Sequence, residues 1–87
     1  MNLYQLKEYV IDGLRAAGQD KNYEALLGDD DVLLQSHTEE FADLTFEIDD
    51  DIVNFYINDG HSTSFSCSSA HAYERTVMGL VYMNAGS

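Results

Sequence analysis

Two runs of consecutive aspartates, Asp29-Asp30-Asp31 and Asp49-Asp50-Asp51, carry the side chain that proteins most often use to bind calcium. An EF-hand loop also requires alternating ligands, a glycine in the middle of the loop and a glutamate at its twelfth position. Neither run supplies this pattern. The sequence therefore favours solvated turns at both runs and predicts no metal site.

The histidines and the single cysteine do not form a recognisable catalytic set. His37, His61 and His71 lack the spacing of metal ligands. Cys67 and His71 are four residues apart, but Cys67 is interpreted as the inward end of a strand, where it would be a small buried side chain. The chain contains no Gly-x-Ser-x-Gly elbow, phosphate loop or dinucleotide fingerprint. We therefore expect no catalytic residue, no cofactor and no enzymatic activity.

Charge is the strongest feature of the composition. Sixteen acidic residues and four basic ones give a formal net charge of −12. Between Lys21 and Arg75 there is no basic residue. This stretch holds most of the acids: Glu24, Asp29, Asp30, Asp31, Glu39, Glu40, Asp43, Glu47, Asp49, Asp50, Asp51, Asp59 and Glu74. Because binding to phosphates relies on Lys and Arg, direct binding to nucleic acid or to an anionic membrane is disfavoured.

The chain of 87 residues is expected to form a single domain with one core. A hydrophobic content of 45% is too high for a disordered chain. Residues 1–8 lack the basic start and the apolar run of a signal peptide. No apolar run approaches the roughly 18 residues of a membrane span. These features predict a cytoplasmic protein.

Both ends of the chain show helical periodicity. Residues 2–17 predict an amphipathic helix with Leu3, Leu6, Val10, Leu14 and Ala17 on one face, ended by Gly18. A second, short helix is predicted over 20–27, with Asp20 as its N-cap and Gly28 at its end. A last helix is predicted over 69–84, capped by Ser68 or Ser69. Its buried stripe is Ala70, Tyr73, Val77, Leu80 and Val81.

The middle of the chain alternates with a period of two, as half-buried strands do. Strands are predicted at about 32–35, 43–48, 52–58 and 62–67, with Asp59-Gly60 as a hairpin turn. Pairing Phe46 with Phe55, and Phe55 with Phe65, keeps the apolar side chains on one face. The predicted fold is a two-layer α+β domain. It consists of an antiparallel meander of three or four strands, covered on one face by the N- and C-terminal helices.

The same alternation assigns an outer, polar face of the sheet. It is expected to carry Thr45, Glu47, Asn54, Tyr56, Asn58, Ser62, Ser64 and Ser66. Tyr56 is an aromatic residue within this polar field, and tyrosine is enriched in interface hot spots. Tyr56 could alternatively cover a neighbouring strand. Together with the sheet acids, it gives the predicted partner-binding residues: Asp29, Asp30, Asp31, Glu39, Glu40, Asp43, Glu47, Asp49, Asp50, Asp51, Tyr56 and Asp59.

In size, acidity and α+β build, the chain resembles the small acidic inhibitors encoded by phages, such as anti-CRISPR and DNA-mimic proteins. The resemblance implies carboxylates that take the place of nucleic-acid phosphates in a basic channel of a target. We therefore predict an inhibitor that binds the Lys/Arg-rich nucleic-acid groove of a bacterial nucleoprotein or nuclease complex and blocks it.

Two other functions fit the same charge. One is an immunity protein or antitoxin that neutralises a basic nuclease toxin. The other is a structural module whose acidity serves solubility alone. The expected state is a monomer or a weak homodimer. Met78 and Tyr82, with Tyr4 or Tyr9, could form an exposed apolar patch for self-association.

Overall fold

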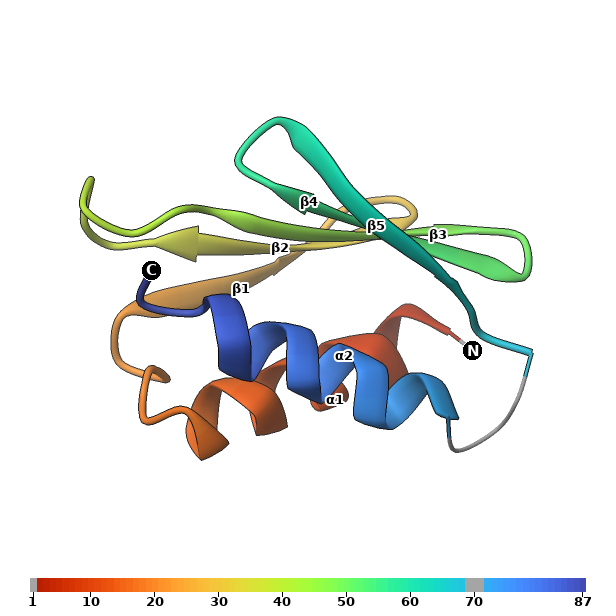
Figure 1. Cartoon of the computed structure of the whole chain (residues 1–87), viewed down its shortest axis with the longest axis horizontal. Coiled ribbons are helices and arrows are strands. Elements are labelled where there is room, and N and C mark those ends of the chain that lie inside the picture. Colours follow the sequence, from red (N-terminus) through yellow and green to blue (C-terminus); the bar gives the residue numbers. More distant parts are fainter. Residues whose placement is uncertain (1, 69–71) are drawn as a thin grey trace.

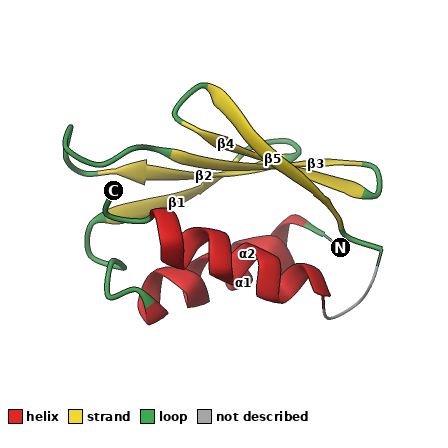
Figure 2. Cartoon of the chain, in the orientation of Figure 1, coloured by secondary structure: helices red, strands yellow, loops and turns green. Residues whose placement is uncertain are grey.

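The computed structural model of the chain describes residues 2–68 and 72–87. Its elements follow one another as α1 (Leu3–Ala16), β1 (Tyr23–Leu27), β2 (Asp31–Ser36), β3 (Leu44–Asp49), β4 (Ile52–Ile57), β5 (Gly60–Ser66) and α2 (Ala72–Asn84). The five strands form one antiparallel meander in the order β1-β2-β3-β4-β5. Figures 1 and 2 show both helices on the same face of this sheet. The predicted two-layer α+β fold is confirmed, with five strands.

Helix α1 begins and ends where the sequence predicts. Asn2 forms a capping box: its Oδ1 accepts the Gln5 N–H (2.9 Å), and Gln5 Oε1 accepts the Asn2 N–H (3.2 Å). Gly18 follows the helix with φ of 70°, a left-handed conformation that suits glycine. The N–H groups of Gly18 and Gln19 then bond the carbonyls of Arg15 and Leu14. This is a Schellman arrangement, which satisfies the last carbonyls of the helix.

The predicted helix over 20–27 is wrong, because residues 23–27 form strand β1. Tyr23–Leu27 is helix-prone by composition, but a helix of eight residues barely offsets the cost of its first turn. Pairing with β2 satisfies the backbone of the segment instead, with Tyr23 opposite Ser36 and Leu27 opposite Val32. Gly28 is therefore part of a hairpin turn rather than a helix end.

The alternation of apolar residues fixes the register of the central strands. Phe46 lies opposite Phe55, as predicted, and their ring centroids are 4.8 Å apart. The predicted pairing of Phe55 with Phe65 is wrong by two residues, because Phe55 lies opposite Thr63 and Val53 opposite Phe65. Since two residues are one period of the pleat, Phe65 still lies on the inner face.

Two features of this hairpin set the observed register, a tight turn at Asn58-Asp59 and a β-bulge in β5. Ile57 pairs with Gly60 and Tyr56 with His61, but the next pair is Phe55 with Thr63, so Ser62 is an extra residue. The strand therefore begins at Gly60 rather than at 62. The bulge also places His61 opposite Tyr56 on the outer face, where the sequence predicted Ser62. Asn58 lies in the turn, with φ of 53°, and not on the outer face.

The core lies between the helices and the inner face of the sheet. Leu6, Val10 and Leu14 of α1 and Tyr73, Val77 and Val81 of α2 are buried, as predicted. From the sheet, Tyr23, Val32, Leu34, Leu44, Phe46, Val53 and Phe55 complete it. Phe65 is half-buried and packs against this core. The predicted start of the last helix at residue 69 and its predicted core residue Ala70 fall within residues 69–71, outside the described residues.

The two helices run in the same direction, side by side. The ring centroids of Tyr9, in the middle of α1, and Tyr73, in the first turn of α2, are 5.5 Å apart, and further along both helices Gly13 faces Val81. The predicted apolar patch is therefore not formed. Tyr9 packs against the core, while the exposed Tyr4 is in the first turn of α1 and the exposed Tyr82 is in the last turn of α2. Neither described helix is long and apolar enough to cross a membrane.

Candidate partner-binding surface

The two aspartate runs lie together at one end of the sheet. In an antiparallel meander the β1–β2 and β3–β4 turns fall at the same end, and the main chain joins them: Ile48 N–H donates to the carbonyl of Asp30 (2.8 Å). We call Asp29, Asp30, Asp31, Asp49, Asp50 and Asp51 the aspartate end. All are exposed except Asp31, which is half-buried. Seventeen residues, 32–48, lie between the two runs in sequence, and the fold brings the runs together into one anionic surface.

No cation neutralises the aspartate end within the described chain. The ion pair found among residues 2–68 and 72–87 is Arg15 Nη1 with Asp12 Oδ1, at 3.9 Å on the exposed side of α1. The other basic residues are Lys7 in α1, Lys21 in the loop before β1 and Arg75 in α2. The described strands carry no Lys or Arg. The fold thus places all four cations on the helical side, together with Glu8, Asp12, Asp20 and Glu74, and leaves the other carboxylates on the sheet and its turns.

Acidic residues continue from the aspartate end onto the outer face. Asp31 lies directly opposite Glu47, and Asp49 follows Glu47 on the same face of β3. Like charges placed directly opposite each other on neighbouring strands are destabilising. The sheet therefore bears an electrostatic cost here that a cationic partner would relieve.

Tyr56 lies beside a hydrogen-bonded network on the outer face and joins it through Glu47. Glu47 Oε1 accepts a bond from Asn54 Nδ2 (3.2 Å) and a longer one from Tyr56 Oη (3.4 Å). Ser64 Oγ donates to Asn54 Oδ1 (2.6 Å) and contacts His61 Nε2 (2.8 Å). The rings of His61 and Tyr56 meet edge to face, 5.5 Å apart. Tyr56 thus contacts the network at its hydroxyl group and at its ring.

Proton positions in this network follow from the acceptors. Glu47 as a carboxylate only accepts, so the Asn54 amide nitrogen faces it and the Asn54 oxygen faces Ser64. Ser64 then donates its one proton to Asn54, and His61 Nε2 must donate to Ser64. A histidine that donates does not withdraw the serine proton. The contact therefore orders the surface and does not prepare Ser64 as a nucleophile.

The environment of Tyr56 raises its pKa above the ordinary value. Partial burial is the main cause, since it disfavours the phenolate. The negative charge of Glu47, its hydrogen bond to the phenol and the charge of Asp49 act in the same direction. The phenol thus stays protonated and remains a hydrogen-bond donor.

The remaining predicted acids lie at the other end of the sheet. Glu39, Glu40 and Asp59 are exposed there, in the β2–β3 and β4–β5 connections. Asp43 is structural: its Oδ1 accepts the Ser36 N–H (2.9 Å), and its own N–H donates to Asn58 Oδ1 (3.1 Å). The predicted binding residues are thus divided between two ends and a face.

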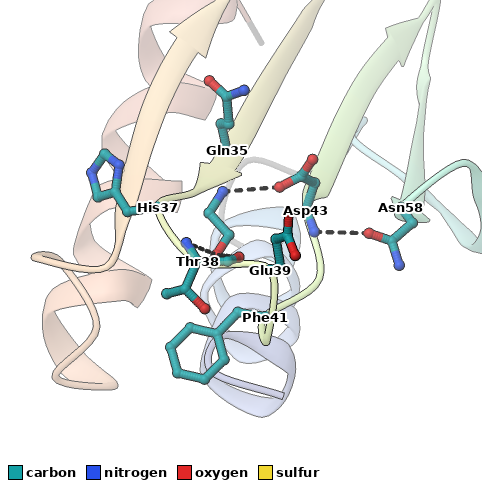
Figure 3. A pocket seen from close by; sticks show the side chains of 8 residues that line it. Gln35, His37, Thr38, Glu39, Phe41, Asp43 and Asn58 are labelled. Atoms are coloured by element: carbon teal, nitrogen blue, oxygen red, sulfur yellow. Dashed lines mark hydrogen bonds between the residues drawn. The ribbon is translucent and has the colours of Figure 1, made fainter.

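A shallow polar depression marks this second end (Figure 3). Asp43 and Glu39 lie at its centre, with Phe41 below them and His37 to one side. The Phe41 ring stacks on Tyr23, with centroids 6.2 Å apart. The polar side chains that line the depression form hydrogen bonds within the β2–β3 connection. For example, Ser36 Oγ donates to the Thr38 carbonyl (2.7 Å). These hydrogen bonds order the β2–β3 loop.

Sequence reasoning did not foresee His61 as a member of the surface. The residue follows an Asp-Gly turn, and simple alternation places Ser62 on the outer face instead. Only the bulge brings His61 beside Tyr56. Asn54 and Ser64 were expected on this face, but their bonds to Glu47 and His61 depend on pairing across three strands.

Comparison of the chain with protein-family models, with curated proteins and with solved structures finds no significant match.

Proposed function

We propose that this protein is an acidic inhibitor, of the anti-CRISPR or DNA-mimic kind, that acts in the cytoplasm. It binds the Lys/Arg-rich nucleic-acid groove of a bacterial nucleoprotein or nuclease complex and blocks it by occupancy. The observation that supports this proposal is the separation of charge. Two aspartate runs meet at one end, beside Glu47 and Tyr56, while the four basic residues lie on the helical side.

A concentrated negative field steers a basic partner and speeds its association. Acidity for solubility alone would be served equally well by carboxylates spread among cations. Here, the like-charge pair of Asp31 and Glu47 is retained although it opposes folding. Tyr56 adds an ordered aromatic contact, of the type that anchors interfaces.

The test begins with affinity capture of the partner from a bacterial lysate at low salt, followed by binding measurements with the purified partner. The main variant neutralises one part of the aspartate end as Asp49→Asn, Asp50→Asn and Asp51→Asn together. A matched control removes the same charge from the helical side, with Glu8→Gln, Asp12→Asn and Asp20→Asn. Exposed ion pairs contribute about 0–1 kcal/mol each, so the aspartate-end variant should weaken binding by up to roughly a hundredfold.

The control should retain affinity within a few-fold. Binding of the unmodified protein should weaken as salt shortens the Debye length from about 10 Å at 0.1 M to about 3 Å at 1 M. The partner's nucleic acid should compete for the same surface. Tyr56→Ala should cost about 2 kcal/mol or more of binding free energy.

If the aspartate-end variant and Tyr56→Ala both bind like the unmodified protein, the surface is elsewhere and the proposal fails. Equal losses in the main variant and the control would show that only net charge matters. A captured nuclease toxin would assign the protein as an immunity protein or antitoxin instead.

A further inference from the structure

Strand β5 is an uncharged edge on a highly charged protein. Its seven residues, Gly60–Ser66, include no Asp, Glu, Lys or Arg, although the chain has a net charge of −12 with histidines counted as neutral. The opposite edge strand, β1, is shorter and carries Glu24. Natural sheets usually protect their edges with charges or with short strands, because a free edge can pair with another chain. In this sheet β1 has that protection, and β5 has no charge to protect it.

The backbone of β5 offers hydrogen-bonding groups on its free side. Cys67 N–H donates to the carbonyl of Asp51 (2.8 Å). The backbone N–H and C=O groups of every second residue, Thr63, Phe65 and Cys67, therefore point towards β4. Val53 pairs with Phe65, which is the same register as the contact between Asp51 and Cys67. Because N–H groups alternate along an antiparallel strand, Ser64 and Ser66 direct theirs away from β4. No strand in the described part of the chain pairs with that side.

We propose that two copies of this protein pair through β5, antiparallel, about a two-fold axis at Phe65. In this register Ser64 of one copy exchanges backbone hydrogen bonds with Ser66 of the other. The two Phe65 residues form the central pair on the inner face, where side chains of a pair without mutual hydrogen bonds lie closest. Phe65 is half-buried in the single chain, and the pairing covers its remaining exposed surface.

The charge distribution selects a second copy as the occupant. A basic partner would be recognised by carboxylates, and β5 has none. Two copies of charge −12 repel each other least where both surfaces are neutral. The axis is perpendicular to the sheet, so both helical layers lie on one side. The outer faces of both sheets then lie on the other side, where the Tyr56 side chain of each copy remains accessible to a partner.

The first test measures mass by light scattering after size exclusion, over a range of protein concentrations and at low and high NaCl. The mass should rise from 9.8 kDa towards twice that value with concentration. It should do so at lower concentration in high salt, because screening weakens the repulsion between copies. Salt has the opposite effect on the basic partner of the proposed function, so the two proposals fail separately.

The second test removes the free edge. Ser64→Pro eliminates an outward N–H and leaves the ladder to β4 intact, a place where sheets tolerate proline. We expect at least a tenfold loss of dimer affinity, with folding checked by far-UV circular dichroism. Ser64→Ala keeps the N–H and should dimerise like the unmodified protein. A Ser64→Pro variant that dimerises as well as Ser64→Ala would overturn the proposal, as would a monomeric mass under all conditions.

The third test fixes the register and does not depend on the proline variant. Thr63→Cys places a thiol opposite Cys67 of the second copy, so mild oxidation should give a covalent dimer on a non-reducing gel. Within one chain these two residues are about 13 Å apart along the strand. That exceeds the roughly 7 Å limit for a disulfide, so any bridge is intermolecular. The unmodified protein, with Cys67 alone, should not cross-link, and equal cross-linking of both proteins would refute the register.

Discussion

Two helix glycines provide a matched pair of substitutions with opposite expected effects. Gly13 of α1 is buried against α2, and a Cβ there would lie 2.9 Å from Val81 Cβ and 3.1 Å from the Met78 carbonyl oxygen. Gly79 of α2 has nothing within 4 Å of the corresponding position. Gly13→Ala and Gly79→Ala are therefore the same chemical change in crowded and in open surroundings.

The magnitudes follow from two opposing effects. Alanine is favoured over glycine inside a helix by about 0.8–1 kcal/mol, so Gly79→Ala should stabilise the protein by that amount. At Gly13 the same gain is opposed by overpacking, which costs about 1–3 kcal/mol, because the nearest atoms are backbone or a Cβ and cannot rotate away. Gly13→Ala should therefore destabilise by roughly 0–2 kcal/mol. The difference between the two variants isolates the packing cost.

Urea unfolding followed by circular dichroism measures both free energies. Thermal unfolding gives a second reading, since about 1 kcal/mol shifts the Tm of a domain this size by about 4–8 °C. The m-value should be the same in both variants, because the surface exposed on unfolding is unchanged. Equal stabilisation by the two substitutions would refute the close contact between α1 and α2.

Two further predictions concern the sheet. Phe55→Ala should lower the free energy of unfolding by about 3–5 kcal/mol, because the side chain is fully buried against Phe46. Ile52→Ala, on the same strand at a position 47% exposed, should lower it by less than about 1.5 kcal/mol. Urea unfolding measures both values. Tyr56 should titrate above the ordinary tyrosine pKa of 10.0, and Glu47→Gln should lower that pKa, as followed by the NMR signal of the Tyr56 phenolic carbon. Since the pKa is raised by folding, the stability linked to Tyr56 is complete below pH 10 and falls as the pH rises through the folded-state value. An unchanged Tyr56 pKa in the Glu47→Gln variant would show that the charge and hydrogen bond of Glu47 do not raise it.

The sequence alone determined the elements whose periodicity leaves no alternative. Leu6, Val10 and Leu14 follow the helical period, and Asn2 and Gly18 provide its two ends. The register of β3 and β4 was predictable because a slip by one residue would expose Phe46 and Phe55 together. The outward position of Tyr56 follows from the same alternation.

Tertiary structure decided the features in which local preference and pairing compete. The sequence Tyr23–Leu27 is helix-prone by itself. It forms a strand because its backbone forms hydrogen bonds with β2 and because the Tyr23 side chain is buried in the core. The extra residue Ser62 moves the pairing of β5 by one residue along the strand, so that His61 lies beside Tyr56. No local pattern specifies such a bulge, since it depends on how two strands fit over one core.

The binding surface shows the same division. The sequence showed how many carboxylates lie between Lys21 and Arg75, but it did not show which of them meet. The meander joins Asp29–Asp31 with Asp49–Asp51 at one end and sends Glu39, Glu40 and Asp59 to the other. Composition determines total charge, whereas the field at a surface depends on distances between charges. Those distances are set by strand order, which only the packing of the whole chain determines.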